Sequence, residues 1–189
     1  VEADETFILL SYKGSRVWER TTKGLPVATN PPDREARKRG GKAAKRGLSH
    51  EQVPVLVAAD RSGTSVCAVL PADNGDAIKA VLDPILSKDV LLVTDGGKAL
   101  VRCATMMKVT HEVLNQSAGE RVRGELHIQT VNSLHGRLKD FLRYRRGVAT
   151  KYLDKYLRWF QLIGTGNRPT PRACLNAAIG PQPRMGVPT

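Results

Sequence analysis

The feature that most constrains the fold is an alternation of short apolar runs with amphipathic segments. Short apolar runs rich in β-branched residues are typical of strands, whereas apolar residues that recur every three to four positions indicate helices. The expected strands are 1–10, 53–59, 64–70, 90–94 and 109–114. The expected helices are 77–86, 98–108, 130–146 and 150–163. Strands and helices in this order predict an α/β fold with a mixed β-sheet flanked by helices.

Turn and capping residues divide these segments. Residues 60–63, Asp-Arg-Ser-Gly, separate two apolar runs and predict a β-hairpin. The run 90–94 is apolar throughout rather than alternating, which is typical of a strand that is buried on both faces. Gly147 is expected to end one long helix, and Thr150 to be the N-cap of the next.

The charge of the chain is strongly positive and uneven. The 189 residues include 30 Lys and Arg against 18 Asp and Glu, which gives a net charge of +12. Residues 13–46 hold eleven basic and three acidic residues, and residues 121–160 hold ten and three, so these segments carry +8 and +7. We therefore expect a polyanionic partner, nucleic acid first and an anionic membrane surface second. No apolar run approaches the roughly 20 residues of a membrane span, which excludes a transmembrane segment.

Two segments are poor in large apolar residues. Within residues 13–50, the stretch 31–47 is rich in Gly, Pro and basic residues and predicts a basic loop or arm, with a solvated loop of no function as the alternative. The Pro-rich segment 165–189 is expected to be an irregular C-terminal tail. The chain begins with Val1 and carries no signal peptide, so we expect it to be a fragment of a longer protein.

Two acidic residues lie in or beside apolar strand segments. Asp4 is within the first predicted strand, and Asp95 follows the buried run 90–94. An ionised carboxylate in a core strand is costly unless a positive group compensates it, and a divalent cation is the simplest such group. If the two strands are neighbours, both carboxylates meet at one edge of the sheet. The alternatives are a turn at Asp95-Gly96 and an ion pair between Asp4 and a local Arg.

The predicted helix 130–146 has an apolar arc bordered by polar residues. Helical spacing places an amide, an imidazole and three cations in a stripe along one edge of this arc. These residues are Asn132, His135, Lys139, Arg143 and Arg146. Lys and Arg suit phosphate oxygens, and the Asn carbonyl oxygen is a ligand that Mg²⁺ accepts. The alternative is an ordinary amphipathic helix with a solvated basic face.

Other residues give weaker signals. Tyr152, Tyr156 and Phe160 lie on one side of the helix 150–163, where core packing is a better interpretation than base stacking. His127 fits no catalytic or metal-binding pattern and is expected to form surface hydrogen bonds. The cysteines show no metal-binding spacing and are interpreted mainly as buried small hydrophobic residues in a reducing cytoplasm.

Several blocks of the sequence resemble insertion-sequence transposases of the DDE superfamily. The block around Asn132 is the most specific of them, and the resemblance covers residues 1–164. The resembling blocks are 2–6 (Glu-Ala-Asp-Glu-Thr), 37–42 (Arg-Lys-Arg-Gly-Gly-Lys), 45–49 (Lys-Arg-Gly-Leu-Ser), 53–61 (Val-Pro-Val-Leu-Val-Ala-Ala-Asp-Arg), 94–96 (Thr-Asp-Gly), 127–139 (His-Ile-Gln-Thr-Val-Asn-Ser-Leu-His-Gly-Arg-Leu-Lys) and 146–160.

The resemblance implies a ribonuclease H-like catalytic domain over residues 1–164. In this superfamily two Asp and a third residue, usually Glu, hold two Mg²⁺ ions, for which Mn²⁺ can substitute. The residues at these positions are Asp4, Asp95 and Asn132. Related insertion-sequence transposases with Asn at the third position are known, and the lost negative charge should weaken the second metal site. By the same resemblance, His135 and Lys139 would position the scissile phosphate.

The implied activity is Mg²⁺-dependent DNA strand cleavage and strand transfer of an insertion sequence. The implied partners are transposon ends and target DNA, bound by a homo-oligomer in the bacterial cytoplasm at the nucleoid, with no role for a membrane. The part that reads the terminal repeats is expected outside this chain. Contacts to DNA are expected from the basic loop and from the end of the helix 130–146, by Arg37, Lys38, Arg39, Lys42, Lys45, Arg46, Arg143 and Arg146.

Two other interpretations stay open. One is a DNA-binding module without catalysis, either a degenerate transposase remnant or an unrelated domain, because the helices joined at Gly147 superficially resemble a helix-turn-helix. The other is a different ribonuclease H-like nuclease, such as a ribonuclease H or a junction resolvase. Asp4 and Asp95 favour an enzyme, since a binding domain has no use for buried carboxylates that face a DNA groove.

Overall fold

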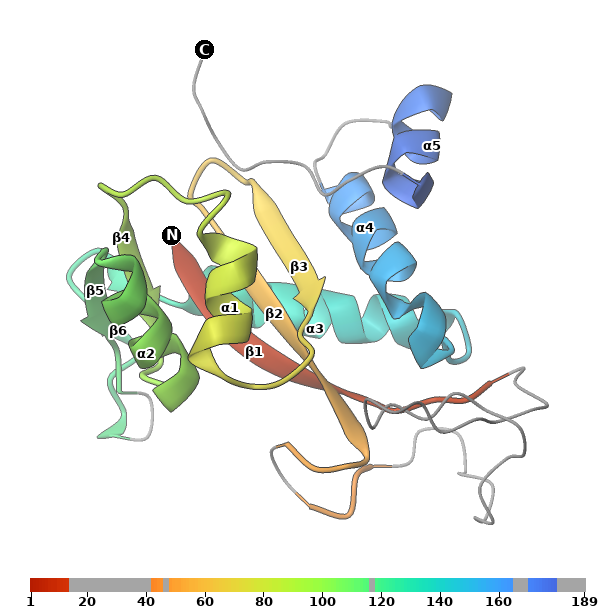
Figure 1. Ribbon diagram of the computed structural model, residues 1–189, viewed down its shortest axis with the longest axis horizontal. Helices are drawn as coiled ribbons and strands as arrows, with labels where there is room; N and C mark the ends of the chain where they lie inside the picture. The colour runs from red at the N-terminus through yellow and green to blue at the C-terminus, as the bar shows by residue number, and fades with distance from the viewer. Residues whose placement is uncertain (14–41, 46–47, 116–117, 165–169, 180–189) are drawn as a thin grey trace.

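One mixed β-sheet forms the centre of the computed structural model (Figure 1). The structure describes residues 1–13, 42–45, 48–115, 118–164 and 170–179. Within these residues, five strands form the sheet in the order β3-β2-β1-β4-β5. The strands are β1 (Glu2–Leu9), β2 (Gln52–Ala59), β3 (Ser65–Val69), β4 (Leu91–Thr94) and β5 (Thr110–Val113).

The sheet combines an antiparallel half and a parallel half. β2 is antiparallel to both β1 and β3, whereas β4 is parallel to both β1 and β5. A parallel pair needs a crossover connection, and helices lead into β4 and β5. The prediction of an α/β fold with a mixed sheet is confirmed, and the arrangement is consistent with the expected ribonuclease H-like fold.

The predicted hairpin joins β2 to β3. The Asp60 carboxylate accepts hydrogen bonds from the backbone N–H of Thr64 at 2.8 Å and from the Ser62 hydroxyl at 2.7 Å. Gly63 has a φ of 95°, in the left-handed region that glycine adopts without steric cost. The side chain of Asp60 and the backbone freedom of Gly63 therefore specify this turn.

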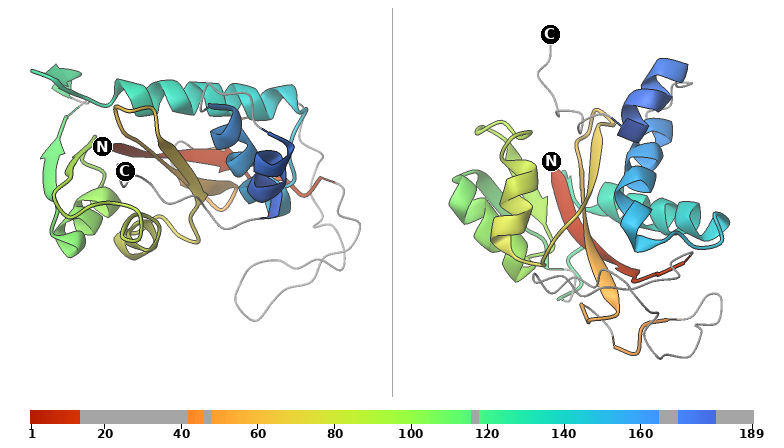
Figure 2. Two further views of the ribbon diagram at one scale, coloured as in Figure 1. Left: turned by 90° about the horizontal axis from the view of Figure 1, so that it is seen from above. Right: turned by 45° about the vertical axis from the view of Figure 1, so that its right-hand side comes forward.

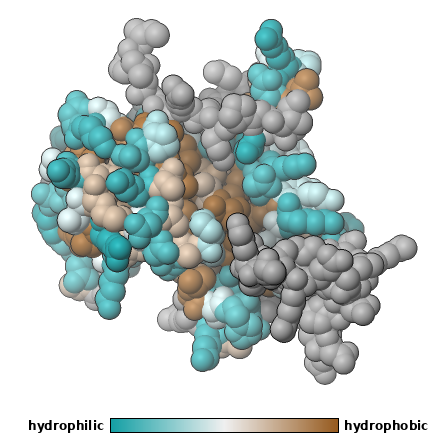
Figure 3. All heavy atoms as spheres, viewed as in Figure 1, coloured by the Kyte–Doolittle hydropathy of each residue, from teal (hydrophilic) through white to brown (hydrophobic). Residues whose placement is uncertain are grey.

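Helices cover both faces of the sheet (Figure 2). On one face, Leu56 and Ala58 of β2 pack in a core cluster with α1 (Gly75–Leu82) and α2 (Lys98–Met107). On the other, Val55 and Val57 pack with α3 (Gln129–Tyr144) and α4 (Leu153–Gly164). Figure 3 shows hydrophobic residues gathered between the α1–α2 pair and α4 on the face in view. Strand alternation thus divides the core into two layers.

The same alternation in β1 directs its acidic side chains to different faces. Ala3 belongs to the core beneath α1 and α2, whereas Ile8 packs in the core beneath α3 and α4. Because successive side chains on a strand point to opposite faces, Asp4 faces α3 and Glu5 faces the α1–α2 side. β1 therefore presents carboxylates to both faces of the sheet.

The helix predicted over residues 77–86 ends at Leu82 in the structure. Pro84 explains the early end, because it has no backbone N–H to donate to the carbonyl of Ala80, although Asp83 before it still has helical geometry. The backbone N–H of Leu86 donates to the Leu82 carbonyl at 2.9 Å, and Leu86 is still buried in the core. The apolar spacing beyond Leu82 therefore reflects a turn after α1 that packs against the same core as the helix.

The connection between α3 and α4 was predicted only in part. α3 ends at Tyr144 with Arg145 as its C-cap, and left-handed backbone begins at Arg146 (φ 55°) and continues at Gly147 (φ 90°), so the helix ends slightly before the predicted stop at Gly147. The prediction of Thr150 as an N-cap is wrong. Thr150 begins the 3₁₀ helix η2 (Thr150–Tyr152) after Ala149, and its hydroxyl accepts a hydrogen bond from the Ser11 backbone N–H at 2.8 Å. Thr150 therefore ties the segment after β1 to the start of the α4 region.

The prediction of an irregular C-terminal tail is wrong for α5 (Pro171–Ile179), which lies beside α4 (Figure 1). Pro171 is its first residue, a position where proline fits a helix because that N–H needs no partner. The Thr170 hydroxyl accepts a hydrogen bond from the Ala173 backbone N–H at 3.1 Å and so caps the helix. The sequence analysis also missed a short hairpin, formed by β6 (Val122–Arg123) and β7 (Leu126–His127).

Candidate active site

The register between β1 and β4 brings the two predicted aspartates to the same level. Glu2 of β1 is paired with Val93 of β4 in parallel orientation. Two residues further along in the direction of both strands, Asp4 is level with Asp95, which directly follows β4. The two strands are neighbours, which is the condition for both carboxylates to meet at one edge of the sheet. The role of this pair in catalysis stays a prediction.

Asp4 lies in a poorly solvated position between β1 and α3. Its side chain is 17% exposed, and its Oδ1 accepts a hydrogen bond from the Glu5 backbone N–H at 2.8 Å. Burial, followed by the charge of Asp95, raises the pKa of Asp4 to about 7, and the Lys139 ammonium opposes this rise. Near neutral pH this carboxylate lacks full electrostatic compensation, so the position favours a cation.

Asp95 serves as a turn residue and remains open to solvent. Its Oδ1 accepts a hydrogen bond from the backbone N–H of Gly97 at 2.9 Å, and Gly97 is the N-cap residue of α2. Gly96 between them has a φ of 87°, and a Cβ there would lie 2.6 Å from Cγ1 of Val113. The turn interpretation is therefore correct, and it leaves the exposed carboxylate at the edge of the sheet where a ligand can reach it.

α3 places an imidazole against Asp4. Nδ1 of His135 lies 3.7 Å from Oδ2 of Asp4, and the His135 side chain is 11% exposed. Burial, with the Lys139 charge, lowers the pKa of His135 to about 4, so the ring is neutral at physiological pH. Asn132 and Lys139 are exposed about one helical turn to either side of His135. In the described residues, no hydrogen bond joins Asn132 to either aspartate.

Glu2 fixes the start of α3, a role that the sequence analysis missed. α3 has no side-chain cap from its own N-cap residue, Ile128. The buried Glu2 carboxylate instead accepts hydrogen bonds from the backbone N–H groups of Thr130 at 2.9 Å and Val131 at 3.2 Å. His127 also lies beside it, with Nδ1 3.0 Å from Oε1. The argument applied to Asp4, a carboxylate in an apolar strand, would have found Glu2 as well.

Glu5 is a second buried carboxylate that the sequence analysis did not assign. Its Oε1 is buried and has no hydrogen-bond partner in the described residues. Burial, followed by the charges of Asp4, Asp73 and Asp95, raises the pKa of Glu5 to about 8. A Cβ on Gly97 would lie 3.3 Å from Oδ1 of Asp95 and 3.6 Å from Oε2 of Glu5. Glu5 therefore approaches Asp95 from the face of the sheet opposite to Asp4.

Comparison with known sequences identifies the family. The ISXO2-like transposase domain matches residues 1–162, which is most of the chain. The chain belongs to this transposase family. It is also 31% identical over 165 residues to a Halobacterium salinarum protein described as an uncharacterized protein in transposable element ISH50. That match covers 86% of this chain and 51% of the relative, so the chain spans about half the length of its curated relative. No solved structure gives a significant match.

The predicted DNA contacts of the transposase domain lie in two regions. Lys42 and Lys45 are exposed before β2. Arg143 is exposed near the end of α3, where it pairs with Asp140 at 2.9 Å, and Arg146 lies just beyond that end. The other predicted contacts lie outside the described residues: Arg37, Lys38, Arg39 and Arg46.

The donor chemistry of the transposase domain at this edge fits a hard divalent cation. Asp4, Glu5 and Asp95 supply carboxylate oxygens, the ligands that Mg²⁺ and Mn²⁺ prefer. A cation there would offset the repulsion that contributes to the raised pKa values of Asp4 and Glu5. In the described residues, no group of three His, Cys, Asp or Glu side chains is arranged to hold a metal ion, so the third ligand at Asn132 stays a prediction.

No helix in the part of the chain that the structure describes has the length and apolar character that crossing a bilayer requires.

Proposed function

We propose that this chain is the catalytic part of an insertion-sequence transposase that cleaves DNA strands and transfers them in the presence of Mg²⁺. The proposal depends on the position of Asp4 in β1 level with Asp95, which directly follows the parallel neighbour β4, and on His135 of α3 beside Asp4. Membership of the transposase family supports it, as does a relative whose name places it in a transposable element.

In this proposal Asp4 and Asp95 hold the cation, and Asn132 supplies a third oxygen from α3. When bound, Mg²⁺ would activate the attacking hydroxyl and stabilise the leaving oxygen at the scissile phosphate. In the cleavage step water attacks phosphorus, the P–O3′ bond breaks and the strand leaves with a 3′-OH. In the transfer step that 3′-OH attacks a target phosphate and displaces another 3′ oxygen.

The chain's own residues would orient these reactants. Neutral His135 is held by burial with its Nδ1 3.7 Å from Oδ2 of Asp4, where the ring would limit the approach of water to that side of the carboxylate. Lys139 is exposed on the same side of α3, where its ammonium suits a phosphate oxygen of the bound strand. Glu2 acts through α3 by fixing the start of the helix that carries these groups.

DNA is the proposed partner, with a homo-oligomer assembled on the transposon ends and the target. The net charge of +12 supports a polyanionic ligand. Lys42, Lys45, Arg143 and Arg146 would contribute backbone contacts, together with the basic residues of the arm that lie outside the described residues.

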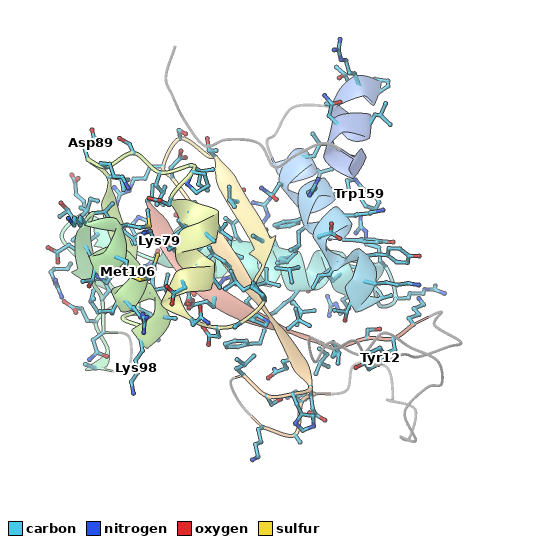
Figure 4. All side chains as sticks on the ribbon, viewed as in Figure 1. Tyr12, Lys79, Asp89, Lys98, Met106 and Trp159 are labelled. Carbon is cyan, nitrogen blue, oxygen red and sulfur yellow. The ribbon has the colours of Figure 1, made fainter. Side chains whose placement is uncertain are left out.

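The experiment is strand joining with a pre-cleaved end. A labelled oligonucleotide that ends in a 3′-OH is incubated with supercoiled plasmid and the 189-residue chain, in Mn²⁺ or in EDTA. We expect a labelled joined product only in Mn²⁺, and at least a hundredfold less product from Asp4→Asn and Asp95→Asn. Asp89→Asn, at an exposed carboxylate on the loop before β4, is the matched control and should keep activity (Figure 4). Joining that survives both active-site changes would overturn the proposal.

A catalytically inactive DNA-binding remnant is the second candidate, and Asn132 favours it. The substitution of an amide for a carboxylate at the third position removes one negative charge that would hold a cation. This candidate predicts DNA binding without joining by the native chain. Restoration of joining by Asn132→Glu would identify the remnant, whereas activity of the native chain would exclude it.

A further inference from the structure

Three exposed aromatic residues lie where the end of α3 leads through η2 into α4: Tyr144 on α3, Tyr152 in η2 and Trp159 on α4. Tyr144, Tyr152 and Trp159 are 74%, 45% and 44% exposed. Figure 4 shows Trp159 on α4, on the opposite side of the molecule from Lys98 and Met106. We call these three residues the aromatic face.

Core packing does not account for the aromatic face. α4 turns Leu153, Leu157 and Phe160 into the core beneath α3 and α4, where all three are buried. The prediction that the aromatic residues of this helix are core residues is therefore correct for Phe160 and wrong for Tyr152. The core beneath α4 is complete without the exposed rings.

Cations lie over each of the exposed rings. Arg143 is 5.4 Å from the centroid of the Tyr144 ring, and Lys151 is 4.9 Å from that of Tyr152. Arg145 lies 3.5 Å from the Phe141 ring and 4.5 Å from the Trp159 ring, and donates a hydrogen bond to the Phe141 carbonyl. Arg145 therefore orders the ring of Trp159 from one side and leaves the ring partly open to solvent.

The charge of this region matches a polyanion. Residues 143–159 contain six basic residues against one acidic residue, Asp154. The flexible, positively charged side chains of Lys and Arg bind phosphates, and aromatic rings stack on the faces of bases. Bases in duplex DNA are already stacked on each other, so their faces are available only in an unpaired strand. Rings interleaved with cations thus favour single-stranded DNA over duplex DNA.

We propose that the aromatic face binds single-stranded DNA, with unpaired bases stacked on Tyr144, Tyr152 and Trp159 and the phosphates beside the neighbouring cations. Tyr144 is nine positions after His135 in α3, a rise of about 14 Å along the helix. A few unpaired nucleotides that extend from the edge of the sheet at Asp4 and Asp95 could therefore reach the aromatic face. The proposal shares with the proposed function only its partner, DNA, and it requires neither a metal ion nor cleavage.

The test is anisotropy of labelled 12-nucleotide strands with the full chain in EDTA. The probes are a mixed-sequence single strand, its duplex, and an abasic strand with the same phosphates. We expect the single strand to bind about tenfold or more tightly than the abasic strand, because stacking contributes at each base. The double variant Tyr144→Ser, Tyr152→Ser should lose about tenfold on the single strand and nothing on the abasic strand. Trp159→Phe reports on the third ring with less risk to packing against Phe141.

Controls separate stacking from charge and from folding. Lys98→Ala and Lys108→Ala remove exposed charges from the α2 region and should leave the ratio between the two strands unchanged. Circular dichroism and the midpoint of unfolding confirm that the Tyr variants are folded. Asp4→Asn should retain the preference for the single strand, so a failure of the proposed catalysis leaves this test intact.

Two results would overturn the proposal. The first is equal affinity for the single strand and the abasic strand. The second is a dimer of the free chain that the Tyr144→Ser, Tyr152→Ser variant dissociates, which would assign the aromatic face to contact with a second copy.

Discussion

Glu2 and Thr130 are joined by two hydrogen bonds, although 128 positions separate them in the chain. The Glu2 carboxylate accepts one from the Thr130 backbone N–H and one from its hydroxyl, each at 2.9 Å. A carboxylate at a helix N-terminus also interacts favourably with the helix dipole. This contact links the strand that carries Asp4 to the helix that carries His135, so the two halves of the candidate site are held in register.

Removal of the Glu2 carboxylate should therefore destabilise the fold. We expect Glu2→Ala to lower the free energy of unfolding by about 3 kcal/mol, because buried N–H groups lose a charged acceptor. Glu2→Gln keeps one acceptor oxygen and should cost about half as much. Urea denaturation measures both. Glu112→Gln, at a partly exposed carboxylate paired with Arg123, is the control and should cost less than about 1 kcal/mol. Equal losses at Glu2 and Glu112 would contradict this role.

The buried Glu5 carboxyl should make stability fall as pH rises. Its pKa is raised from 4.5 to about 8, so between these values the folded chain binds more protons than the unfolded chain. The free energy of unfolding then decreases with pH across this window, and the stabilisation is lost as pH passes about 8. Asp4, with a pKa raised to about 7, adds to the same trend.

Glu5→Gln should reduce that pH dependence. Because the amide carries no charge to bury, we expect the variant to exceed the native chain in stability by about 1–3 kcal/mol at pH 8 and to match it near pH 4. Urea unfolding at a series of pH values supplies the slopes. Asp76→Asn, at an exposed carboxylate, should leave the slope unchanged. A native chain whose stability rises from pH 5 to pH 8 would refute this account of Glu5.

Gly96 and Gly63 differ in the space around them, although both have a positive φ. A Cβ at Gly96 would lie 2.6 Å from Cγ1 of Val113, whereas one at Gly63 would meet nothing within 4 Å. Gly63→Ala should cost about 1 kcal/mol from backbone strain alone. Gly96→Ala should cost about 2 kcal/mol more, since Val113 or the turn must move. Thermal unfolding of the pair tests this, and similar losses would show that Val113 yields freely.

Lys139 should contribute a phosphate contact. We expect Lys139→Ala to weaken DNA binding about equally for all sequences and to reduce the salt dependence of binding by about one charge. Binding isotherms at several salt concentrations give that slope. Lys98→Ala, at an exposed lysine that begins α2, serves as the matched control and should leave the slope as it is. The contact is disproved if both variants change the slope alike.

The sequence predicts local elements well because their signals are local. The apolar runs around Val55 and Val66, with Asp60 and Gly63 between them, specify the hairpin through side chains within a few residues. The buried character of β4 is likewise visible in its own residues. Gly147 marks the end of α3 to within a few residues because glycine adopts a positive φ readily, although the left-handed backbone already begins at Arg146.

The rest depends on contacts between distant segments. Thr is a residue type that often forms an N-cap, but the Thr150 hydroxyl instead accepts a hydrogen bond from the backbone N–H of Ser11, in the segment after β1. The apolar run of β1 does not reveal that Glu2 caps α3 or that Glu5 approaches Asp95 from the other face. The prolines after Gly164 indicate irregular structure, yet Pro171 occupies the one helical position that suits it.

Calorimetric titration of Mn²⁺ into the 189-residue chain measures whether Asp4 and Asp95 form a site for a divalent cation. We expect the native chain to bind Mn²⁺, Asp4→Asn and Asp95→Asn to abolish binding, and Asp89→Asn to preserve it. Tighter binding by Asn132→Glu would place Asn132 in the same site. Absence of Mn²⁺ binding by the native chain, both with and without DNA, would show that Asp4 and Asp95 do not form a cation site.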